Sequence, residues 1–243
     1  MGNENSAQVI GPYYTNRIVL NSAAFIEAHP SPIIELDTED RAAYIDDLTL
    51  AGYLRGFILD LKADYISTDG MTVDYKAIRQ SPKYVKYVLA SSLLRHVNLA
   101  ELADHEKKAF CLNVYNALVI HALCEGLLSD PTSSFSRIVF YARVSYDIGG
   151  TIFTLNDIEN GLLRRNRRSP LPMNFPPFSR SDSRQQFMLA ECDPRIHFAL
   201  NCGAQSCPPI NDYSSDAIEL DAQLNLATEG IGHCHHYHLY CNY

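Results

Sequence analysis

The stretch Phe-Cys-Leu-Asn-Val-Tyr-Asn-Ala-Leu-Val-Ile-His-Ala-Leu-Cys, residues 110–124, decides the fold. We expect it to belong to a helix that is capped by Asp104, runs from His105 and stops at Gly126. Its apolar residues point almost all round the helix axis, and such a helix is stable only when other elements cover it on every side. The sequence therefore predicts a central, buried helix.

Elements on both sides of this helix predict an α+β domain. The apolar spacing from about residue 40 to 128 is helical, and Ser81-Pro82 is typical of a helix start. The β-branched and aromatic residues of 137–154 surround Gly149-Gly150 and predict a hairpin. Polar and apolar residues alternate over 195–201, which predicts a further strand. We expect N-terminal helices around the central buried helix, packed on a small, mostly antiparallel sheet.

Two shorter helices are marked by their caps. Thr154 and Asp157 have the spacing of a capping box, and Asp216 opens a last helix in the same way. The first of these helices ends in a cluster of four arginines, namely Arg164, Arg165, Arg167 and Arg168. These cations either complement the dipole at the helix C-terminus or form a basic patch for a phosphate.

Composition favours one globular domain. The chain has 243 residues, of which 47% are hydrophobic and 20% are charged, enough for a sizeable core. We place the domain at residues 41–228, after an extended or disordered arm (1–40) and before a His/Cys-rich tail (229–243) without metal-site spacing. The formal net charge of −8 disfavours wholesale nucleic-acid binding, because an acidic chain repels phosphate.

The expected localisation is cytoplasmic. We find no apolar run long enough to span a membrane and no signal-peptide pattern, and we expect the seven cysteines to be thiols. Residues 1–6 match the N-myristoylation pattern with Gly2 as acceptor. Membrane association is expected only through that acyl chain, and a single chain anchors weakly. The alternative is an ordinary disordered terminus.

The densest group of reactive side chains lies in residues 193–209. His197 and Asn201 share the polar face of the expected strand, and Cys202 follows at a turn. A cysteine nucleophile needs an imidazole that lowers the thiol pKa and donors for the developing oxyanion. This predicts Cys202 as nucleophile, His197 as base, and Asn201 or the Gly203 amide as oxyanion donor. The alternative is that Cys202 is a small, buried apolar side chain.

Two amides share one face of the central helix. Asn113 and Asn116 lie within about 60° of each other around the helix axis. Buried amides must be hydrogen-bonded, since an unpaired one is costly. Either this face is a wall of the site, or the amides hold the backbone of a neighbouring loop. We interpret His121 as a satisfied core histidine.

Four segments together resemble the family known as domain of unknown function 547. They are residues 108–121, 148–150, 155–164 and 193–209, in the family's order, and the resemblance extends over about residues 45–228. The family includes stand-alone bacterial proteins and eukaryotic ones that carry glutaredoxin, DEP or leucine-zipper segments. Its name implies no activity. From the family's motif positions we take four candidate binding residues: Asn113, Asn116, Glu159 and Arg195.

The chain departs from the family pattern at three places. Family members usually carry Trp at the position of Cys111, so Cys111 is not expected to be a nucleophile. They usually carry His at the position of Asn160. If that histidine were the partner of Cys202, His197 would have to serve as base here. The family domain normally continues past the helix that ends near Thr228, and the tail of this chain resembles a truncated C-terminus.

Two classes of function stay open. The first is a thiol-dependent hydrolase or acyl transferase, although the chain has Pro208-Pro209 where papain-like enzymes begin a helix. The second is a non-catalytic interaction or regulatory module whose motif residues are structural. We expect no cofactor and no metal, and the expected partner is an unidentified small molecule or protein.

Overall fold

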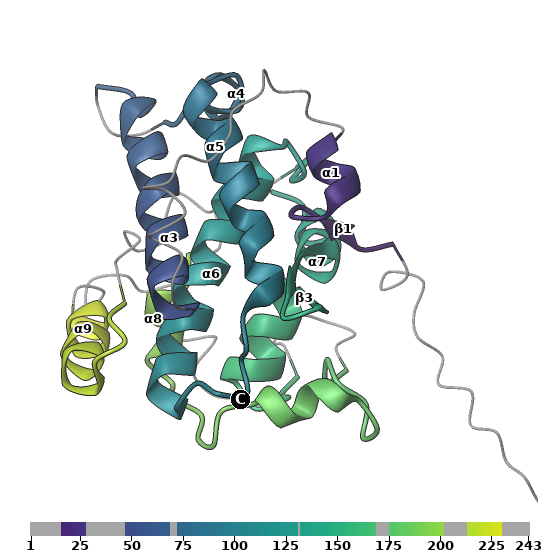
Figure 1. The fold of residues 1–243 in the computed structure, drawn as a ribbon, viewed down its shortest axis with the longest axis vertical. Coiled ribbons are helices and arrows are strands. Elements are labelled where there is room, and N and C mark those ends of the chain that lie inside the picture. Colours follow the sequence, from purple (N-terminus) through teal and green to yellow (C-terminus); the bar gives the residue numbers. More distant parts are fainter. Residues whose placement is uncertain are drawn as a thin grey trace, which may run out of the picture.

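The computed structural model describes residues 16–27, 47–68, 72–130, 132–168, 175–201 and 213–229. It is an α+β domain in which helices surround one central helix and a small sheet lies to one side (Figure 1). The elements, in chain order, are β1 (Ile18–Val19), α1 (Ala23–Glu27), α3 (Asp47–Asp64), α4 (Tyr75–Arg79), α5 (Pro82–Ser91), the 3-10 helix η2 (Ser92–His96), α6 (Asp104–Cys124), α7 (Ser134–Arg143), β2 (Val144–Ile148), β3 (Thr151–Thr154), the π-helix η3 (Asp157–Leu163), the 3-10 helix η4 (Ser183–Phe187), α8 (Ile196–Ala199) and α9 (Ala217–Glu229).

The predicted central helix is α6. Every residue from Phe110 to Cys124 except Leu123 is buried. In Figure 1 the helix lies between α3 and the strands, and α4, η3, α9 and β2 also contact it. Its burial on all sides follows from a sequence with no continuous polar face.

The C-terminal end of α6 was predicted correctly, and its N-terminal cap was not. Gly126 ends the helix as expected, with a positive φ of 68° that favours glycine. Asp104 is the first helical residue rather than the cap. The Glu106 carboxylate instead accepts a hydrogen bond from the Ala103 N–H at 2.8 Å, while Asp104 accepts one from the Ala190 N–H at 2.6 Å. The aspartate thus binds a distant loop, which the sequence pattern did not reveal.

The predicted hairpin is formed by β2 and β3, and it begins later than expected. These strands pair antiparallel from Ser145 opposite Thr154 to Ile148 opposite Thr151. Gly149 and Gly150 form the turn with φ of 60° and 74°, values at which other residues are strained. Residues 138–143 belong to α7 rather than to a strand. The Ser133 hydroxyl starts this helix by accepting from the Ser136 N–H at 3.3 Å, and strand propensity yields to such local context.

The predicted strand over 195–201 is wrong, because residues 196–199 form the short helix α8. Ile196, Ala199 and Leu200 are buried, and the spacing of these three residues is that of a helical turn. Phe198, which the strand prediction placed in the core, is only half-buried. The seven residues 195–201 therefore fit both the two-residue period of a strand and the 3.6-residue period of a helix, and residues 196–199 form a helix.

Residues 16–27, which we assigned to an extended arm, pack against the domain. β1 pairs parallel with β2, so Ile18 lies opposite Val144, and Leu20 is fully buried. The sheet therefore has the order β1-β2-β3, with one parallel and one antiparallel pair. The rest of the predicted arm, with Gly2, and the tail after Glu229 lie outside the described residues.

Local cap predictions are confirmed at three helices. The Ser81 hydroxyl accepts from the Tyr84 N–H at 3.1 Å at the start of α5. Before η3, the Thr154 N–H donates to Asp157 at 2.9 Å, and the Asp157 N–H donates back to the Thr154 hydroxyl at 3.0 Å. Asp216 accepts two backbone hydrogen bonds at the start of α9. In the described part of the chain, no helix is long and apolar enough to cross a membrane.

Candidate functional site

Asn116 joins the central helix to the segment that precedes Cys202. Its Nδ2 donates to the Ala199 carbonyl at 3.0 Å, and its Oδ1 accepts from the Asn201 N–H at 2.8 Å. The side chain is completely buried, so both bonds are shielded from water. The predicted oxyanion donor Asn201 is thus held on α6 by its backbone. Cys202 itself, with Gly203, lies outside the described residues.

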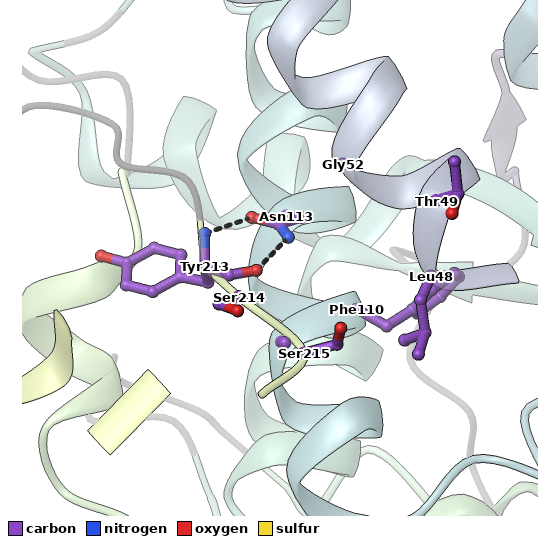
Figure 2. A pocket seen from close by; sticks show the side chains of 9 residues that line it. Leu48, Thr49, Gly52, Phe110, Asn113, Tyr213, Ser214 and Ser215 are labelled. Atoms are coloured by element: carbon purple, nitrogen blue, oxygen red, sulfur yellow. Dashed lines mark hydrogen bonds between the residues drawn. The ribbon is translucent and has the colours of Figure 1, made fainter. Parts of the chain in front are cut away.

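Asn113 makes the same kind of contact one turn earlier, at the wall of a pocket (Figure 2). Its Nδ2 donates to the Tyr213 carbonyl at 2.8 Å, and its Oδ1 accepts from the Tyr213 N–H at 3.1 Å. The amide therefore holds a neighbouring backbone, which was one of its two interpretations, and it also lines a pocket. The pocket has a volume of about 370 Å³, and the described residues that line it carry no charge: Leu48, Thr49, Gly52, Ala109, Phe110, Asn113, Tyr213, Ser214 and Ser215.

His197 lies on α8 and is half-buried. Burial, and secondly the nearby positive charge of Arg164, lower the pKa of His197 to about 4. The imidazole is therefore neutral at pH 7. None of the described residues forms a hydrogen bond with its ring, so among them no group orients the imidazole as the partner of a nucleophile would be oriented.

Glu159 is held against the central helix by a tyrosine. The Tyr115 hydroxyl, almost completely buried on α6, donates to Glu159 Oε2 at 3.0 Å. This bond links η3 to α6 near the Asn116 contact. We did not select Tyr115 as a site residue, although it belongs to the same run of motif positions as Asn113 and Asn116.

Arg195 is engaged in ion pairs rather than directed at an open site. It contacts Asp193 at 2.9 Å and Asp221 at 2.7 Å, and Lys108 of α6 contacts the same Asp193 at 2.9 Å. Burial raises the pKa of Asp193, but hydrogen bonds from Arg195 and Lys108 outweigh burial and hold this pKa well below its usual range. The arginine therefore joins α8 to α9 and, through Asp193, to α6.

A ladder of buried polar side chains runs along η3. Asn160 donates from Nδ2 to Asn156 Oδ1 at 2.9 Å, and Arg164 donates from Nη1 to Asn160 Oδ1. Arg164 also donates to the Arg168 carbonyl at 3.3 Å. Sequence reasoning missed Asn156, although the spacing of four residues along a helix was visible. The Arg164 guanidinium thus binds a side chain and a later carbonyl at the end of this helix.

The candidate residues thus fall into two groups. Asn116 binds the backbone at Ala199 and Asn201, at the end of the helix α8 that carries His197, and the neighbouring Tyr115 binds Glu159. Asn113 lies at the pocket of Figure 2, and Arg195 is directed toward α9. Within the described residues, no group of His, Cys, Asp and Glu side chains is arranged to hold a metal ion.

Comparison with protein families agrees with these motifs. The family described as "Protein of unknown function, DUF547" matches residues 99–230, which is more than half of the chain. The chain belongs to the DUF547 family. The match includes α6, the hairpin, η3, α8 and all of α9. The comparisons with curated proteins and with solved structures gave no match.

Two positions at which the chain departs from the DUF547 pattern, Cys111 and Asn160, are buried in the structure. Cys111, at the position where the family usually has Trp, is buried, and burial raises the pKa of its thiol to about 12. A thiol with such a pKa is inert at neutral pH, in agreement with our expectation. Asn160, where the family usually has His, is the middle member of the η3 ladder.

Proposed function

We propose that this DUF547 domain is a non-catalytic interaction or regulatory module, in which the polar motif residues hold the fold together. The observation that carries the proposal is the use of Asn113 and Asn116. Each amide donates to one backbone carbonyl and accepts from one backbone N–H of a segment that is distant in sequence. Amides used in this way hold segments in place and are not directed at a reacting group.

The electrostatics of His197 support the same proposal. A nucleophilic cysteine is activated when its proton moves to a nearby imidazole. With an ordinary thiol pKa of about 8.5 and a His197 pKa of about 4, that transfer is unfavourable by roughly 6 kcal/mol. A stable pair of thiolate and imidazolium is therefore not expected between Cys202 and His197.

The side chain of Asn160 supports it as well. If the usual family histidine at this position serves as a base, this chain has lost that base. The amide that replaces it cannot take up a proton at neutral pH, and its oxygen accepts a hydrogen bond from Arg164. The position has therefore become part of a buried ladder.

One observation favours the second candidate, a thiol-dependent hydrolase or acyl transferase. Asn116 fixes the backbone of Asn201, and Cys202 is the next residue in the chain. A fixed backbone directly before a nucleophile is what catalysis requires, since misplaced groups react slowly. In this case Cys202 would be the nucleophile, and neutral His197 would remove its proton only as attack proceeds.

The pH dependence of Cys202 alkylation distinguishes these candidates. The rate of reaction with iodoacetamide would be followed at each cysteine by mass spectrometry in the intact protein and in His197→Gln. For a non-catalytic module we expect the Cys202 rate to follow one ionisation near the ordinary value of about 8.5, unchanged by His197→Gln. Cys111 and Cys124 are internal controls, because burial raises the pKa of each to about 12.

The opposite outcome would overturn the proposal. A Cys202 that reacts rapidly at pH 6.5, and that loses this reactivity in His197→Gln, would establish an activated nucleophile. The half-buried Cys192 serves as the matched thiol, since it lies on the same part of the chain before α8 and shows how fast an unassisted cysteine reacts. If Cys192 and Cys202 have parallel pH profiles, the hydrolase is excluded.

A further inference from the structure

Among the residues that the structure describes, Arg164 is a buried cation without a negatively charged partner. Only 2% of the residue is exposed, and within the described residues no Asp or Glu lies at ion-pair distance from it. Two less deeply buried arginines of this region do have carboxylate partners. Arg184 pairs with Asp157 at 2.8 Å and Asp182 at 2.7 Å, while the half-buried Arg195 pairs with two carboxylates. A buried guanidinium is costly unless an anion compensates it.

Hydrogen bonds to the described residues hold the Arg164 guanidinium through only one of its three nitrogens. In the described part of the chain both of its hydrogen bonds are donated by Nη1, to Asn160 Oδ1 and to the Arg168 carbonyl, and both acceptors are neutral. A guanidinium has five N–H donors. The edge formed by Nε and Nη2 is the edge that carboxylate and phosphate groups bind with two parallel hydrogen bonds.

The surroundings of Arg164 are positively charged. Arg165, Arg167 and Arg168 are exposed, and among the described residues none of the three forms an ion pair. His197 lies close by on α8, and the charge of Arg164 affects its protonation. The chain as a whole has a formal net charge of −8, so this concentration of unpaired cations is a local exception. A positive field of this kind attracts oxyanions.

We propose that Arg164, with His197 beside it, forms a binding site for an oxyanion, namely the carboxylate or phosphate group of a small ligand. Asn160 holds the guanidinium at one nitrogen and leaves its other edge for the oxyanion. The inference rests on the proposed function, since it gives the interaction module a class of ligand. The oxyanion site involves other atoms than the test of the proposed function, because neither Cys202 nor its reactivity takes part in anion binding.

Thermal denaturation with simple anions tests the site. The melting temperature of the intact protein would be measured with inorganic phosphate and with acetate, each at about 10 mM, and with chloride at matched ionic strength. We expect phosphate, acetate or both to raise it by about 2–4 °C over chloride, because a ligand that binds only the native state stabilises it. A larger shift with phosphate identifies a phosphate site, and a larger shift with acetate identifies a carboxylate site.

Arg164→Gln and Arg167→Gln form a matched pair of variants. Both remove one positive charge, and the glutamine at position 164 retains an N–H donor for Asn160. We expect Arg164→Gln to abolish the anion-specific shift and the exposed Arg167→Gln to retain most of it. If both variants respond as the intact protein does, the anion binds elsewhere and the inference is wrong.

A second measurement follows His197 directly and leaves Arg164 unchanged. The His197 imidazole would be titrated by NMR with and without phosphate, its signals identified from their absence in His197→Gln. An oxyanion between Arg164 and His197 favours the protonated ring, so we expect phosphate or acetate to raise the pKa of His197 measurably. No shift with either anion would overturn the inference. An activated Cys202 would overturn the proposed function alone, and it leaves these anion measurements unaffected.

Discussion

At the scale of single residues, asparagine amides join segments that no regular element connects. Besides Asn113 and Asn116, Asn21 exchanges two 2.8 Å hydrogen bonds with the backbone of Asp147, and Asn166 exchanges two 2.8 Å bonds with that of Phe178. A carboxamide carries a donor and an acceptor as a peptide group does, so it can pair with a backbone as a strand would. Asn21 and Asn166 thus hold distant backbone segments in the way that we propose for Asn113 and Asn116.

The sequence indicated that Asn113 and Asn116 are hydrogen-bonded, but not to which residues. Buried amides must be paired, and that requirement is local. The partners lie 83 to 100 positions further along the chain. Nothing within α6 distinguishes a loop backbone from a ligand as the partner. Arg195 was ambiguous in the same way, because an arginine that binds a ligand and one that pairs with Asp193 look alike in sequence.

The amide contacts lead to a prediction about stability. Removing one amide leaves a buried carbonyl and a buried N–H unpaired, so we expect Asn116→Ala and Asn113→Ala each to lower the free energy of unfolding by about 2–4 kcal/mol. The exposed Gln186→Ala should change it by less than about 0.5 kcal/mol. Urea denaturation measures all three. Losses below about 1 kcal/mol for both asparagine variants would remove the main argument for a structural role.

At the scale of elements, three side-chain caps were predicted correctly, whereas short elements and long-range pairings were not. The caps at Ser81, Thr154 and Asp216 each involve residues at most three positions apart, and each forms as predicted. β1 has only two residues, and it pairs with β2 at a separation of more than 120 positions. α8 was mistaken for a strand because its few residues satisfy both periods. Short elements depend on what they pack against more than on their own pattern.

Glycines in α3 give a prediction at this scale. A Cβ atom at Gly52 or Gly56 would meet nothing within 4 Å. Alanine is the better helix former, so we expect Gly52→Ala and Gly56→Ala each to stabilise the domain by about 0.5–1 kcal/mol. Gly149→Ala is the opposite case, because its φ is 60° and its Cβ would lie 2.5 Å from the Val97 carbonyl oxygen.

The three glycine variants can be compared by guanidinium denaturation. We expect the Gly149→Ala midpoint to fall and the two α3 midpoints to rise. Gly52 lines the pocket of Figure 2 and Gly56 does not, so Gly56→Ala is the control for any effect of the added methyl group on that pocket. If Gly52→Ala destabilises the domain while Gly56→Ala stabilises it, the space beside Gly52 is not open as described.

At the scale of the whole molecule, the α+β fold was predictable because one helix imposes it. A helix that is apolar on all sides requires neighbours on all sides, and the order of helical and strand patterns limits what they are. The candidate site was predictable only in part. The motif residues of η3 and α8 do meet at the central helix, but the ladder from Asn156 to Arg164 and the low pKa of His197 depend on the packing of distant segments.

That low pKa makes stability depend on pH in a defined window. In the unfolded chain His197 has an ordinary pKa of about 6.5, and in the native state its pKa is about 4. Between these values the unfolded state binds more protons than the native state, so stability falls as the pH is lowered from 6.5 to 4. The loss from this residue amounts to at most about 3 kcal/mol. Below pH 4 it levels off, and the low pKa of Asp193 then adds a further loss as that carboxylate is protonated.

His197→Gln isolates this contribution. Because glutamine does not titrate, the free energy of unfolding of the variant should fall less than that of the intact protein between pH 6.5 and 4, while the two should run parallel between pH 7 and 8. Urea denaturation at each pH measures the difference, and subtracting the two curves cancels every group that they share. Parallel curves across the acid window would mean that His197 titrates normally in the native state. The argument against a thiolate and imidazolium pair at Cys202 would then lose its electrostatic basis.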